Sequence, residues 1–129
     1  MNGLHLRAAA RLAGLVVLTA LATGCAQQPK PLYHWGGYQT NLYEYFKADG
    51  RTPAEQMQRM EAEADRAGAS GAVLPPGFRA HMGLLSLKLG RDGEARGYFE
   101  AEKRAFPEST AFVDSMLRRM DAKKTEPST

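Results

Sequence analysis

The residue with the most versatile chemistry is Cys25, the only cysteine in this 129-residue sequence. A cysteine can serve as a nucleophile, a metal ligand, a disulfide partner or a site of acylation, and its surroundings indicate which. Before it lie a basic start with Arg7 and Arg11 and an apolar run of eleven residues, 12–22. Such a run is too short to cross a bilayer, which takes roughly 20 residues, but it is typical of a cleaved secretory signal. A single cysteine also lacks the companions that a disulfide or a metal site requires.

Small residues lead into this cysteine, in Ala22-Thr23-Gly24-Cys25, and this ending resembles the lipobox of bacterial lipoproteins. The resemblance implies transfer of a diacylglyceryl group to the sulfur, cleavage after Gly24, and usually acylation of the new amine. Two or more acyl chains anchor stably, because each buried CH₂ contributes about 0.8 kcal/mol. We therefore predict a signal peptide over 1–24 and lipidation, for example with palmitate, at Cys25. The alternative is an ordinary secretory signal with an incidental cysteine.

The residue after the cysteine bears on localisation. It is Ala26, whereas an aspartate at this place in proteobacterial lipoproteins tends to retain the protein at the inner membrane. The resemblance therefore implies the inner leaflet of the outer membrane, facing the periplasm. Prolines at 29 and 31 stiffen the chain that follows, so we predict a lipid-anchored tether and aromatic segment over 25–37.

The charge balance argues against several classes of function. The sequence carries 17 basic and 14 acidic residues, but without the signal's Arg7 and Arg11 the remainder has 15 and 14. No basic stripe of the kind that binds nucleic acid is present. His34 and His81 have no companions at metal-ligand spacing, no glycine-rich loop follows a strand, and no serine lies in a nucleophile elbow. We predict no catalysis, no cofactor and no metal site.

The elements that position these residues are helices, because helical spacing dominates after residue 40. Thr52-Pro53-Ala54-Glu55 combines an N-cap, a first-turn proline and a capping box. We expect helices to end at Gly50, Gly68, Gly90 and Pro107, Asp92 and Ser109 to cap the last two, and 123–129 to form a disordered tail. The prediction is an all-α fold over 38–122, a short stack of antiparallel helix pairs.

One helix pair has a more specific pattern, because residues 76–109 resemble a tetratricopeptide repeat of 34 residues. The positions that match its small, turn, small, large and proline sites are Gly83, Gly90, Ala95, Phe99 and Pro107. The resemblance implies that Gly83 admits a close approach of the paired helix, that Ala95 packs there and that Phe99 fills the core. Three positions depart from the pattern: Arg79, Ser86 and Glu102. The alternative fold is a small helical bundle without solenoid curvature.

Six aromatic residues lie between positions 33 and 46. They could fasten the N-terminal segment over the first helix pair, form a recognition surface, or lie at the lipid headgroups near the anchor. We expect Trp35 and Phe46 in the core and at least one of Tyr33, Tyr38 and Tyr43 on a partner-binding surface. Tyr43 is expected there because it lies about 100° around the helix from Leu42, which shares the inward face with Tyr45 and Phe46. The candidate partner-binding residues are Tyr33, Trp35, Tyr38 and Tyr43.

The lipobox together with three further motifs looks like a family of proteobacterial lipoproteins, domain-of-unknown-function family 4810. These motifs are Leu32–Tyr38, Leu74–His81 and Lys88–Arg91 through Phe106-Pro107-Glu108. The resemblance implies a gene beside two other lipoproteins, one similar to the curli-secretion channel protein. The expected function is a lipid-anchored, periplasm-facing adaptor that binds another envelope protein. The alternatives are a cell-wall-acting enzyme and a purely structural stress lipoprotein.

Overall fold

Five α-helices and one short 3₁₀-helix make up most of the described chain, which in this computed structural model comprises residues 31–47 and 50–125. Their bounds are Tyr38–Lys47 (α2), Pro53–Ser70 (α3), Phe78–Lys88 (α4), Asp92–Ala105 (α5), Pro107–Ser109 (η1) and Thr110–Thr125 (α6). Within these ranges there is no strand, only an isolated bridge between Tyr33 and Val73. The predicted all-α class is confirmed. The signal peptide and Cys25 lie outside the described residues.

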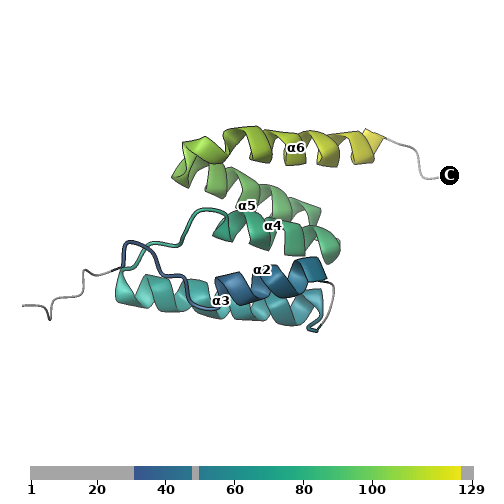
Figure 1. The fold of residues 1–129 in the computed structure, drawn as a ribbon. Helices are drawn as coiled ribbons and strands as arrows, with labels where there is room; N and C mark the ends of the chain where they lie inside the picture. The colour runs from purple at the N-terminus through teal and green to yellow at the C-terminus, as the bar shows by residue number, and fades with distance from the viewer. Residues whose placement is uncertain (1–30, 48–49, 126–129) are drawn as a thin grey trace, which may run out of the picture. The chain divides into compact units, whose positions relative to one another are not determined.

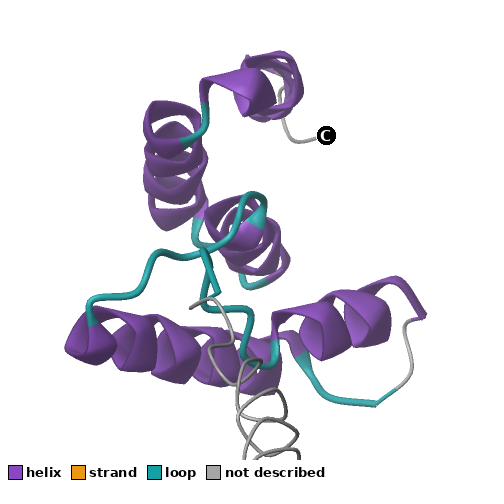
Figure 2. Cartoon of the chain, turned by 60° about the vertical axis from the view of Figure 1, so that its left-hand side comes forward, coloured by secondary structure: helices purple, strands orange, loops and turns teal. Residues whose placement is uncertain are grey.

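Successive helices pack against one another as antiparallel neighbours (Figure 1). The helices α2, α4 and α6 run in one direction, and α3 and α5 return between them. The most extensive contact joins α4 to α5. In the turned view, α4 lies between α2 on one side and α6 on the other (Figure 2). Helices packed in adjacent pairs therefore place α2, α4 and α6 on one face.

The start of α3 follows from its first residues. The Thr52 hydroxyl accepts a hydrogen bond from the Glu55 N–H at 3.3 Å, and the Glu55 carboxylate accepts one from the Thr52 N–H at 2.8 Å. This reciprocal pair is the capping box that the sequence predicts. The backbone donor of Thr52 is the largest cause of the lowered pKa of Glu55. Pro53 lies in the first turn, where a backbone N–H would make no hydrogen bond within the helix, so the lack of one in proline costs nothing.

Two helix ends differ from the prediction. The helix α3 passes Gly68 and ends at Ser70, because Gly71 adopts a left-handed conformation with φ of 65°. The N–H of Ala72 then bonds the carbonyl of Ala67 at 2.9 Å, which satisfies a carbonyl that the helix end leaves without a partner. At the other end of the chain α6 continues to Thr125, so the predicted disordered tail over 123–129 is wrong for its first three residues. Residues 126–129 lie outside the described part.

The predicted cap of α5 is wrong, and the predicted cap of α6 is not shown. Asp92 is the first residue of α5 rather than its cap, and Arg91 occupies the cap position without a side-chain hydrogen bond. The Asp92 carboxylate still lies in the first turn, where its negative charge interacts favourably with the positive end of the helix dipole. Ser109 belongs to η1, and its hydroxyl donates to the Phe106 carbonyl at 2.7 Å. Ser109 directly precedes α6, and this hydrogen bond is to the preceding turn rather than to an N–H of α6.

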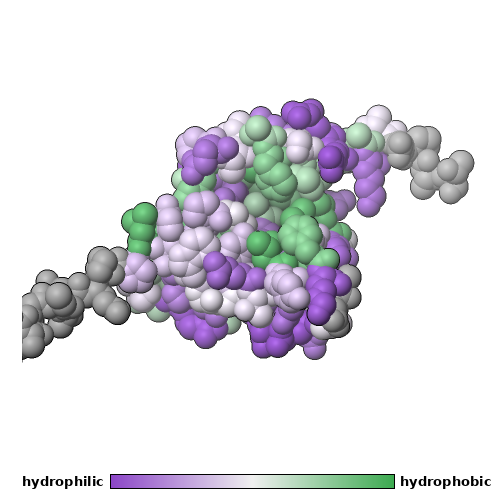
Figure 3. Space-filling view, in the orientation of Figure 1, coloured by the Kyte–Doolittle hydropathy of each residue, from purple (hydrophilic) through white to green (hydrophobic). Residues whose placement is uncertain are grey.

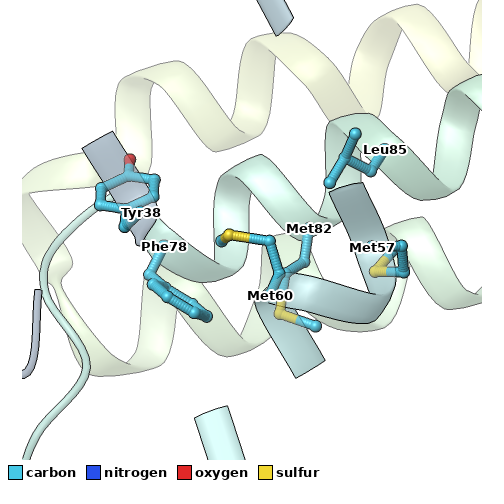
Figure 4. Close-up of a cluster of buried hydrophobic side chains, with 6 residues drawn as sticks. All are labelled: Tyr38, Met57, Met60, Phe78, Met82 and Leu85. Carbon is cyan, nitrogen blue, oxygen red and sulfur yellow. The ribbon is translucent and has the colours of Figure 1, made fainter. Parts of the chain in front are cut away.

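The hydrophobic core consists of two clusters that share α4. The first lies between α2, α3 and α4 and contains Tyr38, Met57, Met60, Phe78, Met82 and Leu85 (Figure 4). The second lies between α4, α5 and α6 and contains Ala80, Ala95, Phe99 and Val113. Because α4 is packed on both sides, it anchors the pair that precedes it and the helices that follow.

Candidate functional site

Ring contacts hold the N-terminal segment of the described chain against the helices. The Tyr33 ring lies edge-on to those of Trp35 and Phe106, with centroids 6.3 and 6.1 Å apart. Trp35 in turn stacks on Tyr38 at 6.3 Å. Each such pair contributes about 0.5–1.5 kcal/mol beyond the burial of its area. This arrangement is the one expected if the aromatic residues fasten the segment.

A polar contact secures the same segment to α3. The His34 N–H donates to the Val73 carbonyl at 2.8 Å, and His34 Nε2 lies 2.9 Å from Glu63 Oε2. Glu63 also pairs with Arg66 at 3.2 Å. The hydrogen bond from His34 is the main reason that the pKa of Glu63 is lowered. Gly36 has a φ of 43°, and a Cβ there would collide with the Glu63 carboxylate, so the turn favours glycine.

The exposures of the aromatic residues correct the sequence analysis. Phe46 and Trp35, expected in the core, are 72 and 43% exposed. Tyr38, a candidate for partner binding, is buried at 7% exposure, and Tyr43 is 64% exposed, as its position around the helix predicts. The reason is that α2 faces the core through Tyr38, Asn41 and Tyr45. Phe46 lies about 100° around the helix from Tyr45 and falls outside this face.

The predicted packing residues lie as follows. A Cβ on Gly83 of α4 would lie 2.8 Å from a ring carbon of Phe99, so only glycine allows this ring its position. Ala95 and Phe99 of α5 are both fully buried in the second cluster. Pro107 ends α5 and begins η1, because a proline cannot continue the helix.

A hollow of about 270 Å³ opens between α2, α4 and the start of α6. Its apolar walls are Leu42 and Phe46 from α2, Leu84 from α4 and Phe112 from α6. We call these four residues the apolar groove. Hydrophobic residues gather on this face between α6 and α2 in the space-filling view (Figure 3). Phe112 is 46% exposed, so the two phenylalanines of the groove leave much of their apolar area to solvent.

Buried polar groups lie beneath this groove. The Glu102 carboxylate accepts hydrogen bonds from the Gly77 N–H at 2.6 Å and the Ala80 N–H at 3.4 Å. These are donors of the first turn of α4, which no N-cap side chain satisfies. Glu102 therefore caps α4 from α5, which gives a structural reason for the departure from the repeat pattern at this position. The pKa of Tyr38 is raised by burial and, secondarily, by Glu102.

His81 is the second buried polar group beneath the groove. Neither ring nitrogen has a hydrogen-bond partner among the described residues, and the ring lies against those of Tyr45 at 5.1 Å and Tyr38 at 6.0 Å. Burial lowers its pKa from 6.5 to about 4. His81 is consequently a neutral packing residue at pH 7.

A second hollow, of about 290 Å³, lies along α4 and α6, which also line the first hollow. It begins at Leu87 of α4 and Met116 of α6, and its remaining lining residues are Asp92, Arg119, Met120, Lys123 and Lys124. We call Arg119, Lys123 and Lys124 the basic end. None of these three forms an ion pair within the described part of the chain.

The titratable groups beneath the groove serve the packing of the chain itself. Among residues 31–47 and 50–125, no three His, Cys, Asp or Glu side chains come together as a metal site. The titratable groups beneath the groove, Glu102 and His81, are taken up by a helix cap and by ring packing. The groove itself offers exposed apolar surface. The described helices are each too short or too polar to cross a bilayer.

Sequence reasoning missed most of the groove. Leu84 and Phe112 appear in the sequence as ordinary members of apolar helix faces, and nothing in their spacing shows that they share a surface. The signal that could have found it is the width of the apolar faces. The helix α4 carries apolar residues on more sides than packing against a single neighbouring helix requires. A helix of that kind is covered on both sides or leaves part of its apolar surface open.

Comparison with known proteins adds one finding. Residues 32–116 match the family model described as a domain of unknown function, DUF4810. No curated protein and no solved structure matches the chain.

Proposed function

This chain belongs to the DUF4810 family, and we propose that it is a lipid-anchored adaptor whose apolar groove binds another protein of the bacterial envelope. The expected partner is an envelope lipoprotein, such as one similar to the curli-secretion channel protein. Cys25 holds the adaptor at the outer membrane, facing the periplasm, through its acyl chains. The tether and aromatic segment over 25–37 links this anchor to the helices.

The observation that carries the proposal is the exposure of Phe46 and Phe112 on opposite walls of one hollow. When a partner covers exposed apolar side chains, each Å² of apolar surface removed from water contributes roughly 25 cal/mol to the free energy of binding. Aromatic residues in such hollows dominate the binding energy of many interfaces. Two exposed aromatic residues contributed by two helices to one hollow support the proposal that it is a surface for another protein.

The helix packing supports a tetratricopeptide-like scaffold for this adaptor. The small residue Gly83 lies against Phe99, with Ala95 buried beside them, as that repeat requires. In a stack of this kind the first helices of successive pairs share one face, and α2, α4 and α6 do so here. The proposal includes no catalytic step.

Site-specific photo-cross-linking in intact cells tests the groove. Benzoylphenylalanine placed at Phe46 or Phe112 should give one discrete adduct with an envelope protein, because both positions face the hollow. The matched control is the same residue at Arg59, which is exposed on α3. Leu84→Asp should abolish both adducts while leaving the helical circular dichroism unchanged. Equal adducts from Arg59, or none from the groove, would remove the basis of the proposal.

A further inference from the structure

The two hollows lie about one helical turn apart along α4 and α6, and we call the pair the track. Leu84 and Phe112 line the first, and Leu87 and Met116, three and four residues further on, line the second. Three or four residues are one helical turn, a rise of about 5.4 Å. Because α4 and α6 run in the same direction, the next turn of each helix lines the second hollow.

The chemistry of the track changes along its length. The four apolar side chains of the groove line the first hollow together with Tyr38, His81 and Glu102, which are themselves buried. The second carries the three cations of the basic end against a single carboxylate, Asp92. Of the described carboxylates near this end, Asp121 already pairs with Arg96 and Glu94 with Arg91. Among the residues that the structure describes, the basic end therefore keeps a net positive charge.

We propose that the track binds an amphipathic protein segment that carries acidic side chains at one end. Its apolar residues fill the space between Phe46, Leu84 and Phe112, and its carboxylates lie over Arg119, Lys123 and Lys124. Each hollow holds one or two large side chains, so apolar residues about one helical turn apart match the spacing of the two hollows. The inference rests on the proposed adaptor function and specifies the chemistry of the partner.

Charge complementarity is the reason for choosing this occupant. Three cations on one rim attract an acidic segment over roughly a Debye length, about 8 Å at physiological salt. They also disfavour a basic segment, because like charges brought together at an interface cost several kcal/mol. An uncharged apolar segment would leave the basic end without a partner.

A displayed library of random 14-residue peptides, selected against the full chain, tests this inference. Enriched peptides should combine apolar residues three or four apart with Asp or Glu at one end. Selection against Arg119→Glu/Lys123→Glu should lose the acidic preference, and a peptide enriched on the natural chain should bind this variant about tenfold more weakly. The matched control is Arg59→Glu/Arg104→Glu, which makes the same charge change at exposed positions elsewhere and should keep the preference.

The outcomes separate this inference from the proposed function. Apolar enrichment with no acidic preference, or with one that survives reversal of the basic end, overturns the inference and leaves the groove as a binding surface. If Phe112→Asp does not reduce enrichment, the groove itself is not the binding surface and both proposals fail. A further outcome concerns lipid. If phosphatidylglycerol vesicles bind the Cys25→Ser chain through the basic end, and peptide selection does not depend on the basic end, these cations bind lipid headgroups and the inference is overturned.

Discussion

At the scale of single residues, His81 shows how burial changes the chemistry of a histidine. Its ring is enclosed by Tyr38 and Tyr45 and its pKa falls from 6.5 to about 4. Below pH 6.5 the unfolded chain therefore binds a proton that the folded chain does not. Folding stability should fall as the pH drops from 6.5 towards 4, by roughly 3 kcal/mol in all, and then level off.

The substitution His81→Leu tests this effect. We expect urea unfolding between pH 7 and pH 4 to show a smaller loss of stability in the variant, because leucine has no proton to gain. Carboxylates such as Glu63 contribute equally to both chains, so the difference between the two profiles isolates the histidine. Parallel profiles would show that His81 is protonated in the folded state as easily as in the unfolded one.

Glu102 shows that a residue on one helix can complete another. Its carboxylate accepts from the N–H groups of Gly77 and Ala80. We expect Glu102→Ala to lower the free energy of unfolding by about 1–2 kcal/mol more than Glu102→Gln, because the amide keeps one oxygen for these donors. Chemical denaturation of both variants measures the difference. Equal stabilities would indicate that water satisfies the first turn of α4.

At the scale of elements, α4 and α5 approach each other closely at Gly83. We expect Gly83→Ala to destabilise the fold by about 1–3 kcal/mol, because the new Cβ would overlap the Phe99 ring. The matched control is Gly97→Ala on α5, where no atom lies within 4 Å of the added Cβ. That change should instead stabilise by about 0.5–1 kcal/mol through helix propensity. Thermal melts that shift in the same direction would contradict this packing.

At the scale of the whole molecule, the proposed adaptor depends on a predicted anchor, Cys25, which lies outside the described residues. The small residues before Cys25 motivate the prediction that Cys25→Ser abolishes palmitate labelling and leaves the signal peptide uncleaved. Metabolic labelling and the electrophoretic mobility of the precursor measure both effects. Undiminished labelling of the variant would place the lipid elsewhere or rule out the anchor.

Much of the local structure could be read from the sequence. The all-α class and the start of α3 at the Thr52–Glu55 capping box depend on residues close together in the chain. Such signals act within one or two helical turns, so no tertiary contact is needed to interpret them. Either Gly68 or Gly71 could end α3 by its residue type. The helix continues past Gly68 to Ser70, and Gly71, in a left-handed conformation, ends it.

The faces of the helices and the apolar groove were decided by the tertiary structure. In α2, aromatic residues lie on more than one side, so periodicity does not distinguish a buried Tyr38 from an exposed Phe46. Packing against α3 and α4 makes that choice. The groove joins Phe46 to Phe112, which are far apart in the sequence. A surface built from several helices exists only once they pack, because no local interaction connects its parts.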